Sequence, residues 1–148
     1  MTTTSRVREG LEQLSIELPS WAFGNSGTRF KVFRHAGVPR DPFEKVLDAA
    51  IVHRVTGAAP SIALHIPWDR VDDYRELAAH AAEHGMRLGA INANTFQDED
   101  YRLGSVAHPD PAIRRKAVAH LFECIDVMDA TGSTDLKLWF ADGTNYPG

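Results

Sequence analysis

The chain has 148 residues, of which 16 are Lys or Arg and 20 are Asp or Glu, and its formal net charge is -4. This acidic balance argues against a surface for nucleic acid or anionic membranes, and no stretch reaches the roughly 20 apolar residues of a membrane span. The single cysteine, Cys124, excludes an intramolecular disulfide and an all-cysteine zinc site. The N-terminus carries Arg6, Arg8, Glu9 and Glu12 without an apolar run, so we expect no signal peptide and a soluble cytoplasmic protein.

A repeated unit of short apolar strand, polar loop and capped amphipathic helix organises the chain from residue 18 onward. Strands that alternate with helices of this length predict an α/β fold with a parallel sheet. The expected strands are 18–23, 61–66, 86–92 and 135–140, and the expected helices begin at Asp41, Asp69 and Asp110 and end before Gly57, Gly85 and Gly132. A further helix at 4–14 is expected to bury Val7, Leu11 and Leu14. The domain division is therefore a helical extension at 1–17 and one α/β domain at 18–148.

Large aromatic residues and a histidine follow the carboxyl ends of these strands, where parallel α/β folds place their sites. They are Trp21, His65, Phe96 and Trp139, and amide and hydroxyl side chains lie beside them. Aromatic rings pack against the C–H faces of a sugar, while its hydroxyls need directed donors and acceptors. The pattern therefore indicates a sugar or polyol pocket, with core packing as the alternative role of each residue.

Two other patterns are interpreted as structural. The segment from Gly24 to Gly27 resembles a phosphate loop, but it lacks the Gly-Lys-Ser/Thr ending and a helix directly after it. His80, Glu83 and His84 match an inverted zinc-peptidase motif. This motif lies at the C-terminus of a helix, at the opposite end of a parallel sheet from the expected site, and we assign it no metal.

Four segments together resemble bacterial L-rhamnose isomerase, a family of the xylose-isomerase-like superfamily. They are Ser20–Phe30, Leu64–Asp69, Asn94–Asp98 and Leu138–Gly148. The resemblance runs from about Leu18 to the last residue. It implies that the chain is the N-terminal half of a (β/α)8 TIM barrel, because a complete barrel needs about 250 residues.

The resemblance also implies an activity and roles for individual residues. The activity is the interconversion of L-rhamnose and L-rhamnulose by a hydride shift assisted by two divalent cations, expected to be Mn²⁺. His65 matches the residue that handles ring opening, and Trp21, Phe96 and Trp139 match the aromatic wall around the sugar. Phe30 matches an aromatic residue that a neighbouring subunit inserts into the pocket, which implies a homotetramer.

The resemblance leaves several points open. The metal ligands of the family belong to later strands, so we expect none in this chain. Asp69 has two candidate roles, orienting His65 or capping the following helix, and the cap is the favoured one. Another sugar isomerase or an epimerase of the same superfamily is an alternative activity. A non-catalytic half-barrel fragment is a further alternative, and the isolated chain is expected to be inactive.

Overall fold

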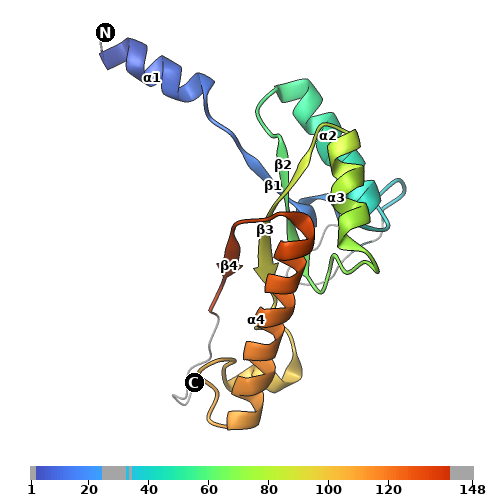
Figure 1. Cartoon of the computed structure of the whole chain (residues 1–148), viewed down its shortest axis with the longest axis vertical. Helices are drawn as coiled ribbons and strands as arrows, with labels where there is room; N and C mark the ends of the chain where they lie inside the picture. Colours follow the sequence, from blue (N-terminus) through green and yellow to red (C-terminus); the bar gives the residue numbers. More distant parts are fainter. Residues whose placement is uncertain (1–2, 25–32, 34, 141–148) are drawn as a thin grey trace.

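The computed structural model describes residues 3–24, 33 and 35–140 (Figure 1). The elements in chain order are α1 (Thr3–Glu12), β1 (Glu17–Pro19), the 3-10 helix η1 (Ser20–Phe23), α2 (Pro42–Thr56), β2 (Ser61–Ile66), α3 (Tyr74–Glu83), β3 (Arg87–Ala93), the 3-10 helix η2 (Glu99–Leu103), α4 (Pro111–Thr131) and β4 (Leu136–Leu138). Within these ranges no helix combines the length and the apolar character that crossing a membrane requires.

The strands form one parallel sheet in the order β1-β2-β3-β4. Leu18 lies opposite Ile62, Leu64 opposite Ile91, and Asn92 opposite Lys137. Each strand neighbours the one before it, so every crossover steps in the same direction along the sheet. This is the strand order of a (β/α)8 barrel and differs from that of a doubly wound sheet, whose order reverses. The predicted α/β fold with four parallel strands, equivalent to half a barrel, is confirmed.

Local sequence signals explain where the main helices begin and end. The Asp41 side chain accepts a hydrogen bond from the Glu44 N–H at 2.9 Å, and Pro42 occupies the first turn of α2. Gly57 ends this helix with a φ of 68°, in the left-handed region that glycine adopts most readily. Asp110 caps α4 in the same way. These boundaries agree with the prediction.

The core lies between the sheet and α2, α3 and α4. Its strand residues alternate along β2, because Ile62, Leu64 and Ile66 face the helices. The residues between them, including His65, therefore face the other side of the sheet. The buried core consists of Val46, Ala49, Ile62, Leu64, Ile66, Leu77, Ala81, Met86, Leu88, Ile91, Ala93, Cys124 and Val127. Cys124 is buried in this core, as the sequence predicts.

Three predicted boundaries are wrong, and one of them is that of the fourth strand, which spans Leu136–Leu138 instead of 135–140. The first strand ends at Pro19 instead of continuing to Phe23, and Ser20–Phe23 form η1. Proline has no N–H to donate to a sheet, which favours this early end. The second helix begins at Tyr74 and is capped by Asp73, not by Asp69, because Asp69 is engaged elsewhere.

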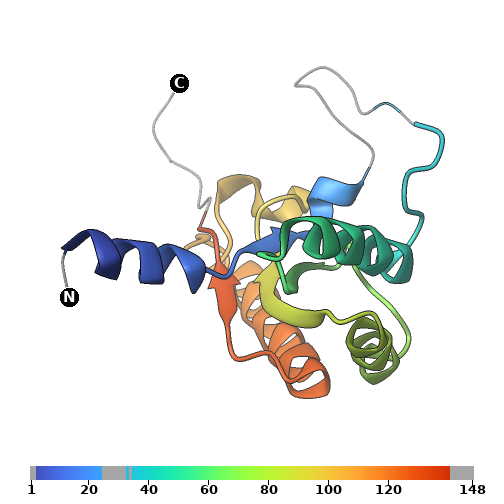
Figure 2. The ribbon, with the colours of Figure 1, turned by 90° about the horizontal axis from the view of Figure 1, so that it is seen from above.

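Helix α1 forms close to its predicted limits, but the burial predicted for it is wrong. Figures 1 and 2 show this helix projecting away from the sheet and the other helices. Val7, Leu11 and Leu14 are all exposed. Several apolar residues on α2 and α4, including Ile51 and Ile125, are exposed as well. The helical periodicity is therefore real, while the surfaces that would cover these residues are not part of the described structure.

A bulge in β3 brings β1 and β4 into contact through their side chains. Between Ile62 and Leu64 of β2 the register shifts, so that two residues of β3, Gly89 and Ala90, lie opposite one residue of β2. The Ala90 N–H donates to the Glu17 carboxylate at 2.9 Å, and Lys137 pairs with the same carboxylate at 2.7 Å. A Cβ at position 89 would meet Glu17 Oε2 at 1.7 Å, so a larger residue there would force the Glu17 side chain to move.

Replacing Gly89 by alanine should lower the free energy of unfolding by about 1–3 kcal/mol, the cost of leaving a buried N–H without its acceptor. The added methyl group displaces the Glu17 carboxylate, and the Ala90 N–H loses its partner. Thermal unfolding followed by circular dichroism measures the change. Gly10→Ala is the matched control, because a Cβ there meets nothing within 4 Å. Equal stability of Gly89→Ala and wild type would contradict the proposed contact.

Candidate active site

A cavity of about 250 Å³ lies at the carboxyl ends of the strands. Four of the five site residues expected from the sequence line it: Trp21 from η1, His65 from β2, Phe96 after β3 and Trp139 after β4. The complete lining is Trp21, His65, Trp68, Asn92, Ala93, Phe96, Lys137 and Trp139. All three tryptophans of the chain therefore border one cavity. The fifth expected residue, Phe30, lies outside the described residues.

His65 is the centre of this aromatic cluster. Its ring stacks on Trp68, with 3.7 Å between the ring centroids and 14° between the ring planes. The rings of Trp21 and Phe96 meet it edge to face, at centroid distances of 5.5 and 5.9 Å. Trp139 packs in turn against Phe96 at 4.7 Å. The imidazole is thus enclosed by three aromatic rings, and only 6% of the residue is exposed.

This enclosure determines the protonation state of His65. Burial lowers the pKa of its imidazole from 6.5 to about 4, the charge of Asp69 opposes the shift, and His120 and Lys45 add to it. The ring is therefore neutral at neutral pH. Its Nδ1 atom is buried without a hydrogen-bond partner among the described residues. Because buried polar atoms are rarely left unpaired, this nitrogen is suited to a hydroxyl group of a ligand in the cavity.

The low pKa of His65 predicts a pH dependence of stability and fluorescence. Between pH 6.5 and about 4 the unfolded chain binds a proton at this site and the folded chain does not. The contribution of neutral His65 to stability is therefore complete above pH 6.5 and falls as the pH decreases towards 4. Protonation near pH 4 should also quench Trp68, which stacks on the ring. Fluorescence and melting temperature measured against pH, each compared with His65→Gln, test this dependence. Identical profiles would contradict it.

Three residues that line the cavity were not assigned to the site from the sequence, although two of them, Trp68 and Asn92, lie at the carboxyl ends of the expected strands. Trp68 follows His65 by three residues and stacks on its ring, while Asn92 and Lys137 come from β3 and β4. Strand alternation could have identified Lys137, since residues two apart on a strand share a face and Trp139 was already assigned. Asn92 is one of the amide residues at the end of the expected third strand, and its side-chain amide donates to the Leu64 carbonyl oxygen at 3.0 Å.

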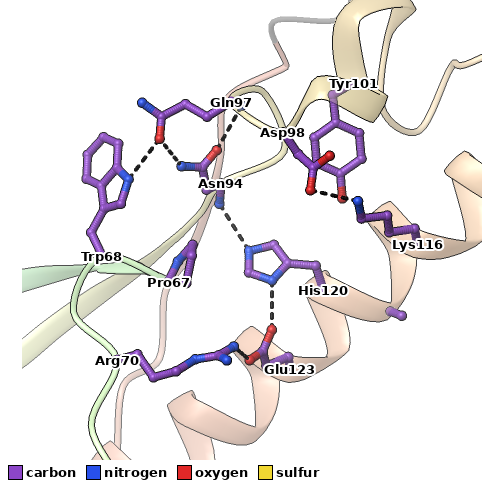
Figure 3. A pocket seen from close by; sticks show the side chains of 11 residues that line it. Pro67, Trp68, Arg70, Asn94, Gln97, Asp98, Tyr101, Lys116, His120 and Glu123 are labelled. Carbon is purple, nitrogen blue, oxygen red and sulfur yellow. Dashed lines mark hydrogen bonds and ion pairs between the residues drawn. The ribbon is translucent and has the colours of Figure 1, made fainter.

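A larger cavity of about 650 Å³ lies between α4 and the segments that follow β2 and β3 (Figure 3). Its charged side chains pair with one another. Figure 3 shows Glu123 between Arg70 and His120, with the imidazole Nδ1 2.8 Å from the carboxylate. Lys116 pairs with Asp98 at 2.6 Å. We assign the candidate site to the smaller cavity, because His65, whose Nδ1 is unpaired, and all three tryptophans line it.

Metal ligation finds no support in the described part of the chain. No group of three or more His, Cys, Asp or Glu side chains there could hold a metal ion. His80 of the zinc-peptidase motif contacts the Phe43 carbonyl oxygen at 3.3 Å, and its ring packs on the Phe43 ring. This contact joins α2 and α3 and makes the histidine a packing residue.

The fold and the cavity define a parallel α/β half-barrel with an aromatic pocket at the carboxyl ends of its strands. The chain is similar to a protein of Mesorhizobium japonicum described as a probable sugar isomerase, with 42% identity over an alignment of 147 positions that covers 96% of this chain. A protein of Rhizobium meliloti with the same description is 40% identical over the same length. The xylose isomerase of Brucella ovis is 36% identical over 58 residues, which are 39% of this chain and 13% of that enzyme.

The match covers only part of each of these proteins. The chain spans about one third, 34%, of the length of the two probable sugar isomerases. No protein-family model matches the chain.

Proposed function

We propose that this chain is part of an aldose–ketose isomerase that interconverts L-rhamnose and L-rhamnulose. The observation that carries the proposal is the unpaired, buried Nδ1 of His65 beside a cavity walled by aromatic rings. The description of two relatives as probable sugar isomerases supports the reaction class. The choice of L-rhamnose rests on the resemblance of the segments around Trp21, His65, Phe96 and Trp139.

The geometry suggests how these residues act on a sugar. A neutral imidazole can accept a proton from one sugar hydroxyl and return it to the ring oxygen, as ring opening requires. Trp21, Phe96 and Trp139 present apolar faces to the C–H groups and exclude water from the carbons that exchange hydrogen. Trp68 stacks on the imidazole and holds its plane.

Metal and assembly belong to the proposal as well. The described residues do not fit a site for the two divalent ions. We assign the ligands of these ions to the later strands, as the resemblance to L-rhamnose isomerase implies. The roles of His65 and the aromatic rings do not depend on where these ions lie. A homotetramer in which Phe30 reaches a neighbouring pocket, a cytoplasmic location and the absence of a nucleic-acid partner complete the proposal.

The test uses the full-length protein that contains this chain, loaded with Mn²⁺ and incubated separately with L-rhamnose and D-xylose. Chromatography of the products should show L-rhamnulose forming faster than xylulose. D-xylose is the second candidate substrate because a relative named xylose isomerase matches 58 residues of the chain. Faster formation of xylulose would overturn the choice of L-rhamnose. No ketose from either aldose would overturn the isomerase, and conversion of added L-rhamnulose to an epimeric ketose would then identify an epimerase.

A further inference from the structure

Asp69 is a fully buried carboxylate beside the candidate site, with 0% of the residue exposed. Its Oδ2 atom accepts hydrogen bonds from the Ser20 hydroxyl and, at 2.7 Å, from the His65 main-chain N–H. Its Oδ1 atom pairs with Lys45 Nζ at 2.6 Å. The Asp69 N–H donates to the His65 carbonyl oxygen at 2.8 Å. Two hydrogen bonds therefore join residues 65 and 69, one to the Asp69 side chain and one between main-chain atoms.

The early end of β1 explains why His65 needs this partner. Main-chain groups of successive strand residues point to opposite edges, and the Ile66 carbonyl oxygen points towards β3, where it accepts from the Asn94 N–H. The His65 N–H therefore points towards β1. Pairing between β1 and β2 stops at Pro19 and Ala63, so no strand residue faces this N–H. The Asp69 carboxylate takes the place of the missing ladder partner.

The same carboxylate connects three walls of the cavity. Ser20 directly precedes Trp21 in η1, His65 is held through its main chain, and Trp68 is the residue before Asp69. Lys45 of α2 supplies the positive charge that a buried carboxylate requires. The contact differs from a histidine–carboxylate pair, because the His65 ring nitrogen Nδ1 stays unpaired.

We propose that Asp69, neutralised by Lys45, is a positioning residue that holds the His65 main chain, Trp21 and Trp68 in the arrangement the reaction requires. This inference rests on the proposed isomerase function for its kinetic consequence only. Its geometric consequence, the placement of His65 among the tryptophans, holds whatever ligand the cavity binds. A misplacement of about 1 Å at a reacting group can cost 100-fold in rate.

The experiment compares Asp69→Asn and Lys45→Met in the full-length protein with two matched controls, Asp98→Asn and Lys116→Met. The controls remove the exposed pair between Lys116 and Asp98, neither of which lines the candidate cavity. We expect the first two variants to lower kcat by about 10- to 100-fold with KM little changed, and the controls to leave kcat unchanged. In the Asp69→Asn/Lys45→Met double variant the losses should not add, because both residues belong to one network.

A pH titration separates positioning from a purely structural role. The charge of Asp69 raises the pKa of His65 and that of Lys45 lowers it. The midpoint of tryptophan quenching should therefore move to lower pH in Asp69→Asn and to higher pH in Lys45→Met. Unchanged midpoints together with unchanged kcat would overturn the inference and leave the isomerase function intact. If the wild-type protein isomerises no sugar, the proposed function fails, and the two midpoint shifts alone decide the role of Asp69.

Ser20→Ala keeps the test decisive if Asp69→Asn does not fold. It removes only the hydroxyl group that joins η1 to Asp69 and leaves the buried ion pair in place. We expect a lower kcat with KM retained and a normal circular dichroism spectrum. Wild-type kcat in folded Ser20→Ala, together with an unshifted quenching midpoint in Lys45→Met, would overturn the positioning role.

Discussion

Replacing His65 by glutamine is expected to lower kcat of the proposed isomerisation by about 100- to 10,000-fold, the range typical of a lost acid–base group. Glutamine can still offer a hydrogen bond, but it cannot take up and release a proton at neutral pH. The buried, neutral ring with an unpaired Nδ1 is the residue of the cavity best suited to that transfer. Steady-state kinetics of the full-length enzyme with L-rhamnose provide the measurement.

His84→Gln is the control for this substitution. His84 is the C-cap of α3 and comes shortly before β3 begins, so it lies at the amino ends of the strands, whereas the cavity lies at their carboxyl ends. The control should retain wild-type kcat. A His65→Gln variant that folds and keeps more than about one tenth of the activity would contradict the role of His65, since such a loss falls below the range of acid–base catalysis.

Replacing Ile91 by alanine is expected to lower the free energy of unfolding by about 2–5 kcal/mol. Ile91 is fully buried in β3, and it lies opposite Leu64 on one side and Leu136 on the other. Truncation removes apolar contacts on both sides and leaves a cavity in the middle of the sheet. Chemical denaturation of wild type and variant measures the difference.

Ile91→Val is the graded control for the core. It removes one methylene group and should cost about 0.5–1.5 kcal/mol, well below the cost of the alanine variant. The order wild type, valine, alanine should hold in both denaturant midpoint and melting temperature. Wild-type stability of Ile91→Ala would contradict the central position of this residue between three strands.

The fold was predictable because its signals are local. Asp41 and Gly57 bracket α2, and Asp110 and Gly132 bracket α4, as capping rules require. The end of β1 was not predictable from apolar content, since Trp21 and Phe23 are apolar but belong to a 3-10 helix. Asp69 was misassigned as a helix cap for a related reason: its partners Ser20 and Lys45 are distant in sequence.

The candidate site was predictable as a place, because parallel strands bring their carboxyl ends to one edge of the sheet. Trp21, His65, Phe96 and Trp139 therefore gather as expected. Their mutual geometry was not predictable. The stacking of His65 on Trp68 and the low pKa of the imidazole depend on burial, and burial depends on how loops from four strands pack together.

The exposed apolar residues mark the limit of such predictions. Val7 and Leu11 follow a helical period and were expected in a core, yet α1 contacts no covering surface in the described structure. Periodicity identifies the face of a helix that is apolar, but it does not identify what covers that face. The relatives extend well beyond the matched region, and this chain spans 34% of their length.

The most direct test of the central claim is a crystal structure of the full-length protein with L-rhamnose bound. The sugar should lie in the cavity between Trp21, Trp68 and Trp139, with one of its oxygen atoms within hydrogen-bond distance of a His65 ring nitrogen. A sugar bound in the larger cavity beside His120 and Lys116, with the pocket around His65 filled by side chains, would contradict the claim.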